Sequence, residues 1–445
     1  MRKFWVQCFS VTLFVFLMME AVFKITDLKM FTEFDVISKA FKDFELTDYA
    51  FNSLRPDPVV DERFAMVNFG TLSRREVAYL IQAINQYKPR VIALDALYNC
   101  EGGLRDSINC PQLLDTLGNL MLSNAIQEAK NVVMGEKLMQ SDSLSKFDSN
   151  IVDSLEISDP IFSDYAHEGF VTLPTDATYQ EDVKIVRSIW PQIVVNGKRE
   201  LAFSVQIANQ YDSNKVKKFL ARNKEEEIIN FFGNIDVVQL RVKTLKANQT
   251  STTNFGTGFY VVDFDDVLKG NVVPGLFKDK IVIIGYLGNY LGHSAWEDKF
   301  FTPLNKKFGG RANPDMFGPV VHANAAAMIL NENYVDEIPD WLKFSIAFTF
   351  CFLTVALFGW MDAKLPIWYD ALSVIIQIIQ IISIMILVVL AFAYYNLKLD
   401  LSLTLAAAAL VGPCYDIFKS VQNEIQNRLT KRRELVSKEQ PSGLT

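Results

Sequence analysis

Hydrophobic residues are concentrated in four segments of the chain, one at its start and three near its end. They cover residues 4–23, 341–361, 371–395 and 401–418, and residues 26–340 between them are mostly polar. Each segment approaches the roughly 20 residues that a helix needs to cross the hydrocarbon core of a bilayer. The pattern predicts four transmembrane helices that hold one large domain against one face of a membrane.

Basic residues indicate which side of the membrane the large domain occupies. Arg2 and Lys3 precede the first segment, and further lysines and arginines follow the last one. Because basic residues near membrane ends stay in the cytoplasm, both termini are predicted to be cytoplasmic and the large domain extracytoplasmic. A cleaved signal peptide is the alternative for the first segment, but the apolar run is long and no small-x-small motif precedes Lys24.

The chain is thus predicted to be a multi-pass protein of the cytoplasmic (inner) membrane. Its predicted parts are an N-terminal transmembrane helix at 1–25, an extracytoplasmic domain at 26–340, three transmembrane helices at 341–418 and a short basic cytoplasmic tail at 419–445.

Within the large domain, strand and helix patterns alternate. Residues 63–69 are an apolar run of strand length, and Ser73 with Glu76 forms a capping box that starts a helix. Apolar residues then recur at helical spacing until Pro89, and 91–94 is a second strand. A strand–helix–strand unit of this length implies parallel strands covered by helices. We therefore predict an α/β domain whose parallel or mixed sheet carries helices on its faces.

Composition and charge narrow the class of partner. Half of the residues are hydrophobic (50%), yet 21% are charged, which fits a soluble domain joined to membrane helices. The net charge of −7, together with basic ends, leaves the large domain acidic. Nucleic acid is therefore not an expected partner, because binding it requires a basic surface.

Two of the five cysteines, Cys100 and Cys110, lie in the predicted outer domain. Cys8, Cys351 and Cys414 lie in or beside the membrane segments. We favour a disulfide between Cys100 and Cys110 over two free thiols, and such a short loop would add about 2–3 kcal/mol of stability. A metal site is disfavoured because no cluster of cysteine and histidine supports it.

Five polar residues of the large domain are candidates for a ligand site. Asp95 ends a predicted parallel strand at its carboxyl side, where open α/β sheets bind ligands. His293, Asp298, His322 and Asn324 lie close together near the domain's end, and such groups can bind a divalent metal or respond to pH. No H-x-x-H or H-E-x-x-H spacing is present, so structural roles are favoured for the histidines and Asn324. For Asp95 a helix cap or loop anchor is an equal alternative.

The sequence gives little support for catalysis. It contains no nucleophile elbow, P-loop or metalloprotease motif, and the glycines at 285, 288 and 292 lack the spacing of a dinucleotide loop. Asp95 and Asp298 could act as an acid–base pair, but their separation in sequence leaves their geometry open. We predict neither an enzyme nor a bound cofactor.

The membrane segments contain two further patterns. Ser373, Gln377, Gln380 and Ser383 share one face of the third segment, and with no charge at mid-span they favour helix packing over an ion path. In and beyond the fourth segment, apolar residues recur every four positions: Ile417, Val421, Ile425 and Leu429. This spacing predicts a short amphipathic helix that lies on the inner leaflet or meets a partner.

Three blocks of sequence together resemble a known family. They are 63–99 (RFAMVNFGTLSRREVAYLIQAINQYKPRVIALDALYN), 280–304 (KIVIIGYLGNYLGHSAWEDKFFTPL) and 318–330 (GPVVHANAAAMIL). The order and spacing of these blocks, and the three membrane segments behind them, resemble the CHASE type-two domain, an extracytoplasmic bacterial sensor module. The resemblance implies signal input to a histidine kinase, nucleotide cyclase or protein kinase. The residues after 418 are too few for a catalytic domain, so we expect the output to lie in a separate partner, and we expect a homodimer.

The leading hypothesis is thus a receptor that binds a small molecule or envelope component and signals through its membrane helices. The alternative is a structural or accessory subunit of an envelope complex, and an accessory subunit of a transporter is less favoured because the spans lack charge. The polar segments 141–158 and 247–258 are read as loops, either lids or insertions.

Overall fold

The computed structural model describes residues 2–26, 45–56, 58–99, 115–140, 152–175, 184–235, 258–293, 298–305 and 313–438. The chain forms two compact units: a helical unit, Met1–Thr47 with Asp336–Thr445, and a sheet domain, Asp48–Val335.

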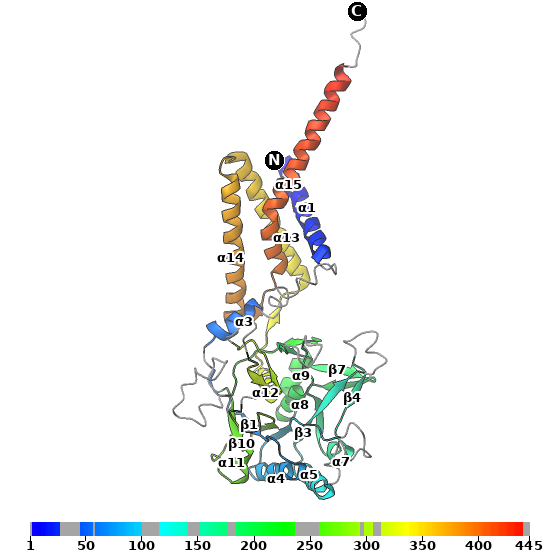
Figure 1. The fold of residues 1–445 in the computed structure, drawn as a ribbon, viewed down its shortest axis with the longest axis vertical. Coiled ribbons are helices and arrows are strands. Elements are labelled where there is room, and N and C mark those ends of the chain that lie inside the picture. Colours follow the sequence, from blue (N-terminus) through cyan, green and yellow to red (C-terminus); the bar gives the residue numbers. More distant parts are fainter. Residues whose placement is uncertain are drawn as a thin grey trace, which may run out of the picture. The chain divides into compact units, whose positions relative to one another are not determined.

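The sheet domain is built on one mixed sheet (Figure 1). Within the described residues its strands follow the order β10-β1-β11-β2-β3-β4, and β5 also pairs with β3. Their bounds are β1 Phe64–Asn68, β2 Val91–Leu94, β3 Val132–Met139, β4 Ser154–Glu156, β5 His167–Phe170, β10 Tyr260–Asp263 and β11 Ile281–Gly285. All of these pairs are parallel except β3 with β4. The α/β prediction is confirmed.

The central strands consist of consecutive apolar residues because both faces of the sheet are covered. Every residue of β1, β2 and β11 is buried, as expected for parallel strands that lie between helices. The helix between β1 and β2, α4 (Arg74–Asn85), begins with the predicted capping box. The Glu76 amide donates to the Ser73 hydroxyl, and the Ser73 amide donates to the Glu76 carboxylate at 2.8 Å.

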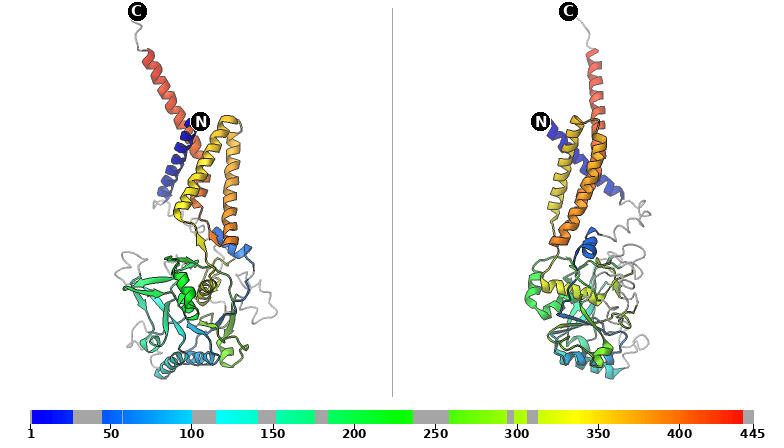
Figure 2. Two further views of the ribbon diagram at one scale, coloured as in Figure 1. Left: turned by 180° about the vertical axis from the view of Figure 1, so that it is seen from behind. Right: turned by 90° about the vertical axis from the view of Figure 1, so that its left-hand side faces the viewer.

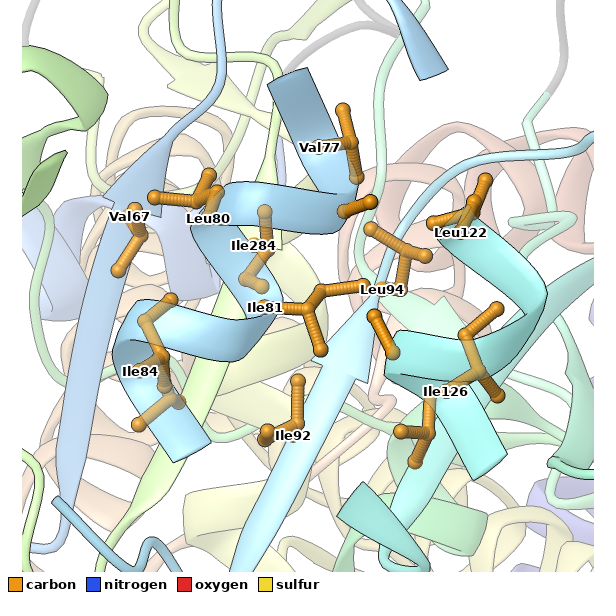
Figure 3. Close-up of a cluster of buried hydrophobic side chains, with 14 of the residues drawn as sticks. Val67, Val77, Leu80, Ile81, Ile84, Ile92, Leu94, Leu122, Ile126 and Ile284 are labelled. Atoms are coloured by element: carbon orange, nitrogen blue, oxygen red, sulfur yellow. The ribbon is translucent and has the colours of Figure 1, made fainter. Parts of the chain in front are cut away.

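One face of the sheet is covered by α4 and α5 (Thr116–Ala129) (Figure 1). Figure 3 shows Val77 and Ile81 of α4 meeting Leu94 of β2 and Ile126 of α5 in the main apolar cluster. Since α4 is amphipathic, burial of this face is what holds it on the sheet.

The other face carries α8 (Phe203–Tyr211) and α12 (Gly318–Asn331). Residues Gly318 to Leu330 of α12 are all buried, so this helix lies in the interior of the domain. The contact between α12 and the sheet is close: a Cβ on Gly285 would collide with the ring of Pro319.

Shorter elements complete the domain. They are α7 Pro160–Ser163, β6 Ser188–Ile189, β7 Gln192–Val195, β8 Lys198–Leu201, α9 Ser213–Leu220, β9 Glu227–Ile228, α11 Phe264–Leu268, β12 Lys299–Phe300 and β13 Met316–Phe317, with the π-helix η2 Ala50–Leu54 near its start. The segment 141–158 was predicted to be a loop. Its end forms β4, so that prediction is wrong there, while 141–151 lie outside the described residues.

The helical unit contains α1 (Arg2–Thr26), α13 (Asp340–Lys364), α14 (Tyr369–Tyr395) and α15 (Ser402–Lys438). Strands β14 (Asp336–Glu337) and β15 (Leu397–Lys398) pair in parallel. The short helix α3 (Leu46–Tyr49) spans the division of the chain into the two units. Among the described residues, three helices are long and apolar enough to cross a membrane: Lys3–Lys24, Asp340–Lys364 and Tyr369–Tyr395. The fourth predicted span, interrupted by Pro413 and Asp416, is not among them and stays a prediction.

The polar stripe of the third hydrophobic segment packs helices together. The Gln377 amide donates to the Ala408 carbonyl of α15 at 2.8 Å, and the Gln380 amide donates to the Thr354 hydroxyl of α13 at 3.0 Å. Gly412 makes room for Gln377, because a Cβ there would lie 2.5 Å from its Oε1. The predicted packing role of these glutamines is confirmed.

Replacing Ile81 by alanine tests the packing of α4 on the sheet. Ile81 is fully buried, so the change should leave a cavity and cost about 2–5 kcal/mol of unfolding free energy. Tyr79→Ala on the same helix, where the side chain is 50% exposed, should cost far less. Thermal denaturation of the full-length protein in detergent measures both, and equal losses would contradict the packing described above.

Candidate functional site

The carboxyl edge of the sheet brings residues from three parts of the sequence together. Asp95 follows the last residue of β2, and its amide donates to the Ile284 carbonyl of β11 at 2.9 Å. Leu94 packs into the cluster beneath α4 and α5, so the next side chain points to the opposite face. There Gly285 lies close by, since a Cβ on Gly285 would be 3.4 Å from the Asp95 Cβ.

Asp298 contacts Gly318, the first residue of α12. Its carbonyl accepts a hydrogen bond from the Gly318 amide at 3.0 Å. Both carboxylate oxygens lie over Gly318, 3.4 Å from the position of a Cβ there. The backbone of Asp298 is left-handed (φ 56°), a conformation that costs energy for residues other than glycine. The adjoining pair of short strands, β12 with β13, fixes this geometry.

The two aspartates share one electrostatic environment. Burial raises the pKa of Asp95, and the negative charge of Asp298 raises it further. Burial also raises the pKa of Asp298, while the positive charge of Lys184 lowers it. Asp95 is half-buried, and Asp298 as a residue is exposed although its carboxylate lies over Gly318. The pair therefore holds a proton more strongly than isolated carboxylates do.

The raised pKa values give this pair defined binding properties. A protonated carboxyl donates a hydrogen bond and an ionised one accepts, so together they can recognise a ligand that presents both a donor and an acceptor. Perturbed carboxyl groups at the carboxyl edge of a parallel sheet are typical of functional sites. Lys184, which sequence analysis did not single out, belongs here as the nearby positive charge.

His322 lies on α12 but is enclosed by protein. Its side chain is 2% exposed, and its ring meets the Phe203 ring edge-on with centroids 5.3 Å apart. Burial lowers the pKa of His322 to about 4, against a smaller opposing effect of its hydrogen bond to the Val171 backbone. His322 is therefore neutral at physiological pH and cannot report pH changes near 7.

Asn324 uses its side chain to fix the backbone of another segment. Its carbonyl accepts from the amides of Phe232 (3.1 Å) and Gly233 (3.3 Å). Its amide donates to the carbonyls of Gly233 (2.8 Å) and Val320 (2.9 Å). Asn324 therefore holds α12 against the segment that contains Phe232 and Gly233. Because these bonds occupy its side chain, we do not include Asn324 in the candidate site.

His293 lies in the turn after β11. Its amide donates to the Tyr290 carbonyl at 3.0 Å, and its ring meets the Tyr290 ring edge-on. Its Nδ1 is buried and has no hydrogen bond to any residue that the structure describes. Among the described residues, no hydrogen bond or ion pair joins His293 or His322 to the two aspartates. Nor does the described part of the chain group three metal-ligating side chains.

The predicted disulfide between Cys100 and Cys110 lies outside the described residues, so it stays a prediction. Most of the segment 247–258 also lies outside them.

Comparison with known proteins identifies the domain that carries this site. The family model of the CHASE2 domain matches residues 45–361, which include the whole sheet and α12. No curated protein and no solved structure matches the chain significantly.

Substituting Asp95 by asparagine tests the electrostatics of the pair. The folded state keeps a proton on Asp95 at pH values where the unfolded chain has lost it, so wild-type stability falls as the pH rises above about 4. Asp95→Asn should remove that loss and raise the unfolding free energy at pH 8 by at least about 1.4 kcal/mol, the equivalent of one pKa unit.

The gain should shrink as the pH falls toward 5, because the wild-type carboxyl is then also protonated. Thermal denaturation of the full-length protein at both pH values measures it. Asp265→Asn, at an exposed position of α11, is the matched control and should change either value by no more than about 0.5 kcal/mol, because it removes only an exposed ion pair with Lys269. An Asp95→Asn gain that does not vary with pH would contradict a raised pKa at this site.

Proposed function

Because the chain belongs to the CHASE2 domain family, a family of extracytoplasmic sensor domains, we propose that it is a membrane-anchored sensor that relays a signal to a separate partner protein. The observation that carries this proposal is the Asp95–Asp298 pair, two carboxyl groups whose ionisation the fold disfavours at the edge where α/β sheets bind ligands. The signal would be a small molecule or envelope component that binds there. The family is sensory and not catalytic, which supports a role without enzymatic activity of this domain.

A short covalent connection supports the relay. Gly318, under the Asp298 carboxylate, begins α12, and α12 ends at Asn331. Only residues 332–339 separate α12 from α13, which begins at Asp340. A ligand that binds two positions of α12 with different affinity would shift their populations and pull on the first residues of α13.

Polar contacts at one end of the helical unit would pass the movement to α15. Asp362 of α13 forms an ion pair with Lys419 of α15 at 2.5 Å and accepts from the Tyr415 hydroxyl at 3.3 Å. The Tyr369 hydroxyl of α14 donates to Asp416 of α15 at 3.0 Å. These bonds join the three helices, so α15 would follow a displacement of α13.

The output element in this proposal is α15. Figure 2 shows it continuing as one helix past the ends of α13 and α14. The apolar residues predicted in the tail lie on this helix and are 45–53% exposed: Ile417, Val421, Ile425 and Leu429. An exposed apolar stripe of this kind is suited to a partner helix.

We further propose that the start of α15 crosses the cytoplasmic membrane, which would place both termini inside the cell. Ala407, Val411 and Cys414 of this segment are buried in one apolar cluster with residues of α1 and α13. Basic flanks at both ends support the orientation. A homodimer remains a prediction from the family resemblance.

An accessory subunit of an envelope complex is the second candidate. Its support is a pair of exposed apolar residues on α5, Leu117 (58% exposed) and Leu120 (49%), which could serve as a docking surface.

Affinity purification of the full-length protein from gently solubilised membranes tests the relay. A histidine kinase, nucleotide cyclase or protein kinase should co-purify with wild type and be lost from the Ile425→Asp/Leu429→Asp variant, because charges in the stripe oppose apolar packing. Asn423→Asp/Asn427→Asp adds the same charge at the same spacing on α15 and should retain the partner. Co-purification of envelope components without a signalling enzyme would favour the accessory subunit. Equal loss of the partner from both variants would contradict the claim that the apolar stripe of α15 binds it.

A further inference from the structure

Three glutamates that are distant in sequence lie on neighbouring strands of the sheet domain. They are Glu136 of β3, Glu168 of β5 and Glu200 of β8. In the parallel register of β3 and β5, Met134 pairs with Glu168 and Glu136 pairs with Phe170. Because side chains alternate along a strand and paired residues point the same way, Glu136 and Glu168 share one face.

A bridge between the end of β5 and the residue after β8 places the third glutamate, Glu200. Phe170 and Ala202 form a parallel bridge, which places Glu200 beside Glu168 on the same face. Met134 packs in the cluster with α4 and α5, so the glutamates lie on that face of the sheet and Asp95 lies on the opposite one. This acidic cluster (Glu136, Glu168 and Glu200) is therefore separate from the aspartate pair.

The deepest member of the acidic cluster is Glu136, and one of its carboxylate oxygens has no hydrogen-bond partner among the described residues. Glu136 is 2% exposed, and within the described residues its Oε1 is buried without a partner, as is Oε1 of Glu168. Burying an unpaired carboxylate oxygen costs free energy, and native proteins rarely leave one so. Both oxygens can therefore accept hydrogen bonds from a polar ligand that reaches this face of the sheet.

The charges around Glu136 indicate whether such a ligand carries positive or negative charge. Burial raises the pKa of Glu136 to about 7, and the charges of Glu168 and Glu200 raise it while that of Lys198 lowers it. Burial also raises the pKa of Glu168. The positive charge of Lys198 lowers this pKa, and the negative charges of Glu200 and Asp164 raise it. Lys198 pairs with Glu200 at 2.8 Å, yet its side chain is 79% exposed. The three carboxylates of the cluster outnumber its one ammonium group by two, and Asp164 adds a further negative charge near Glu168.

We propose that the acidic cluster binds a small organic dication, a linear diamine whose ammonium groups pair with Glu136 and Glu168. Lys198 on Glu200 already shows an ammonium group held by this cluster. A metal ion is not the ligand we infer, because the described residues group no three ligands at metal-binding geometry. Entry would be from the β8 side, where Glu168 and Glu200 retain partial exposure. This site is additional to the one at Asp95 and does not depend on the proposed function.

Calorimetric titration of the full-length protein in detergent with 1,4-diaminobutane tests the proposal. Wild type should bind, and Glu136→Gln and Glu168→Gln should each weaken binding about tenfold or more, because each removes one charge-assisted bond. Glu128→Gln, on exposed α5 surface, should bind as wild type. Affinity should rise from pH 6 to pH 8, since Glu136 must lose its proton to pair with an ammonium group.

Butylamine, with one ammonium group, should bind at least about tenfold more weakly than the diamine. Glutamine has nearly the shape of glutamate, and thermal denaturation of each variant confirms that it is folded. The proposal is overturned if wild type does not bind, if both glutamine variants bind as tightly as wild type, or if butylamine binds as tightly as the diamine.

Discussion

The close contact of α12 with β11 is the constraint on which the rest of the sheet domain depends. Pro319 lies against Gly285 so closely that no side chain fits between them, and residues Gly318 to Leu330 of α12 are buried. From this position Gly318 meets the Asp298 carboxylate, and Asn324 holds Phe232 and Gly233. A displacement of α12 would therefore disturb both the aspartate pair and the connection to α13.

Two acidic sites on opposite faces of one sheet share a physical feature. At Asp95 and at Glu136, burial favours the protonated carboxyl, so each site lowers the stability of the fold when it is ionised. A domain selected for stability alone would place apolar or paired residues at such positions. In the two proposals above, a bound ligand would compensate the charge at each site, which is the property expected of a sensor.

Sequence analysis succeeded where structure is determined locally. The Ser73–Glu76 capping box and the helical spacing after it identify α4, and three of the long apolar segments form helices long and apolar enough to cross a membrane. It failed where partners are distant in sequence. Strand β4 is three residues long and forms only by pairing with β3. Glu136, Glu168 and Glu200 share one face of the sheet because of two strand registers that no local sequence pattern encodes. Sequence analysis named Asp95 and Asp298 as candidates but could not predict that they lie near each other.

Hydrogen–deuterium exchange of the full-length protein in nanodiscs tests the central claim, that the state of the aspartate pair reaches the membrane helices. Asp95→Asn/Asp298→Asn removes the charge that a bound ligand would compensate. We predict altered exchange in residues 332–339 and in α15 as well as around the substitutions, and no such change for Asp265→Asn. Changes confined to the sheet domain would contradict the relay.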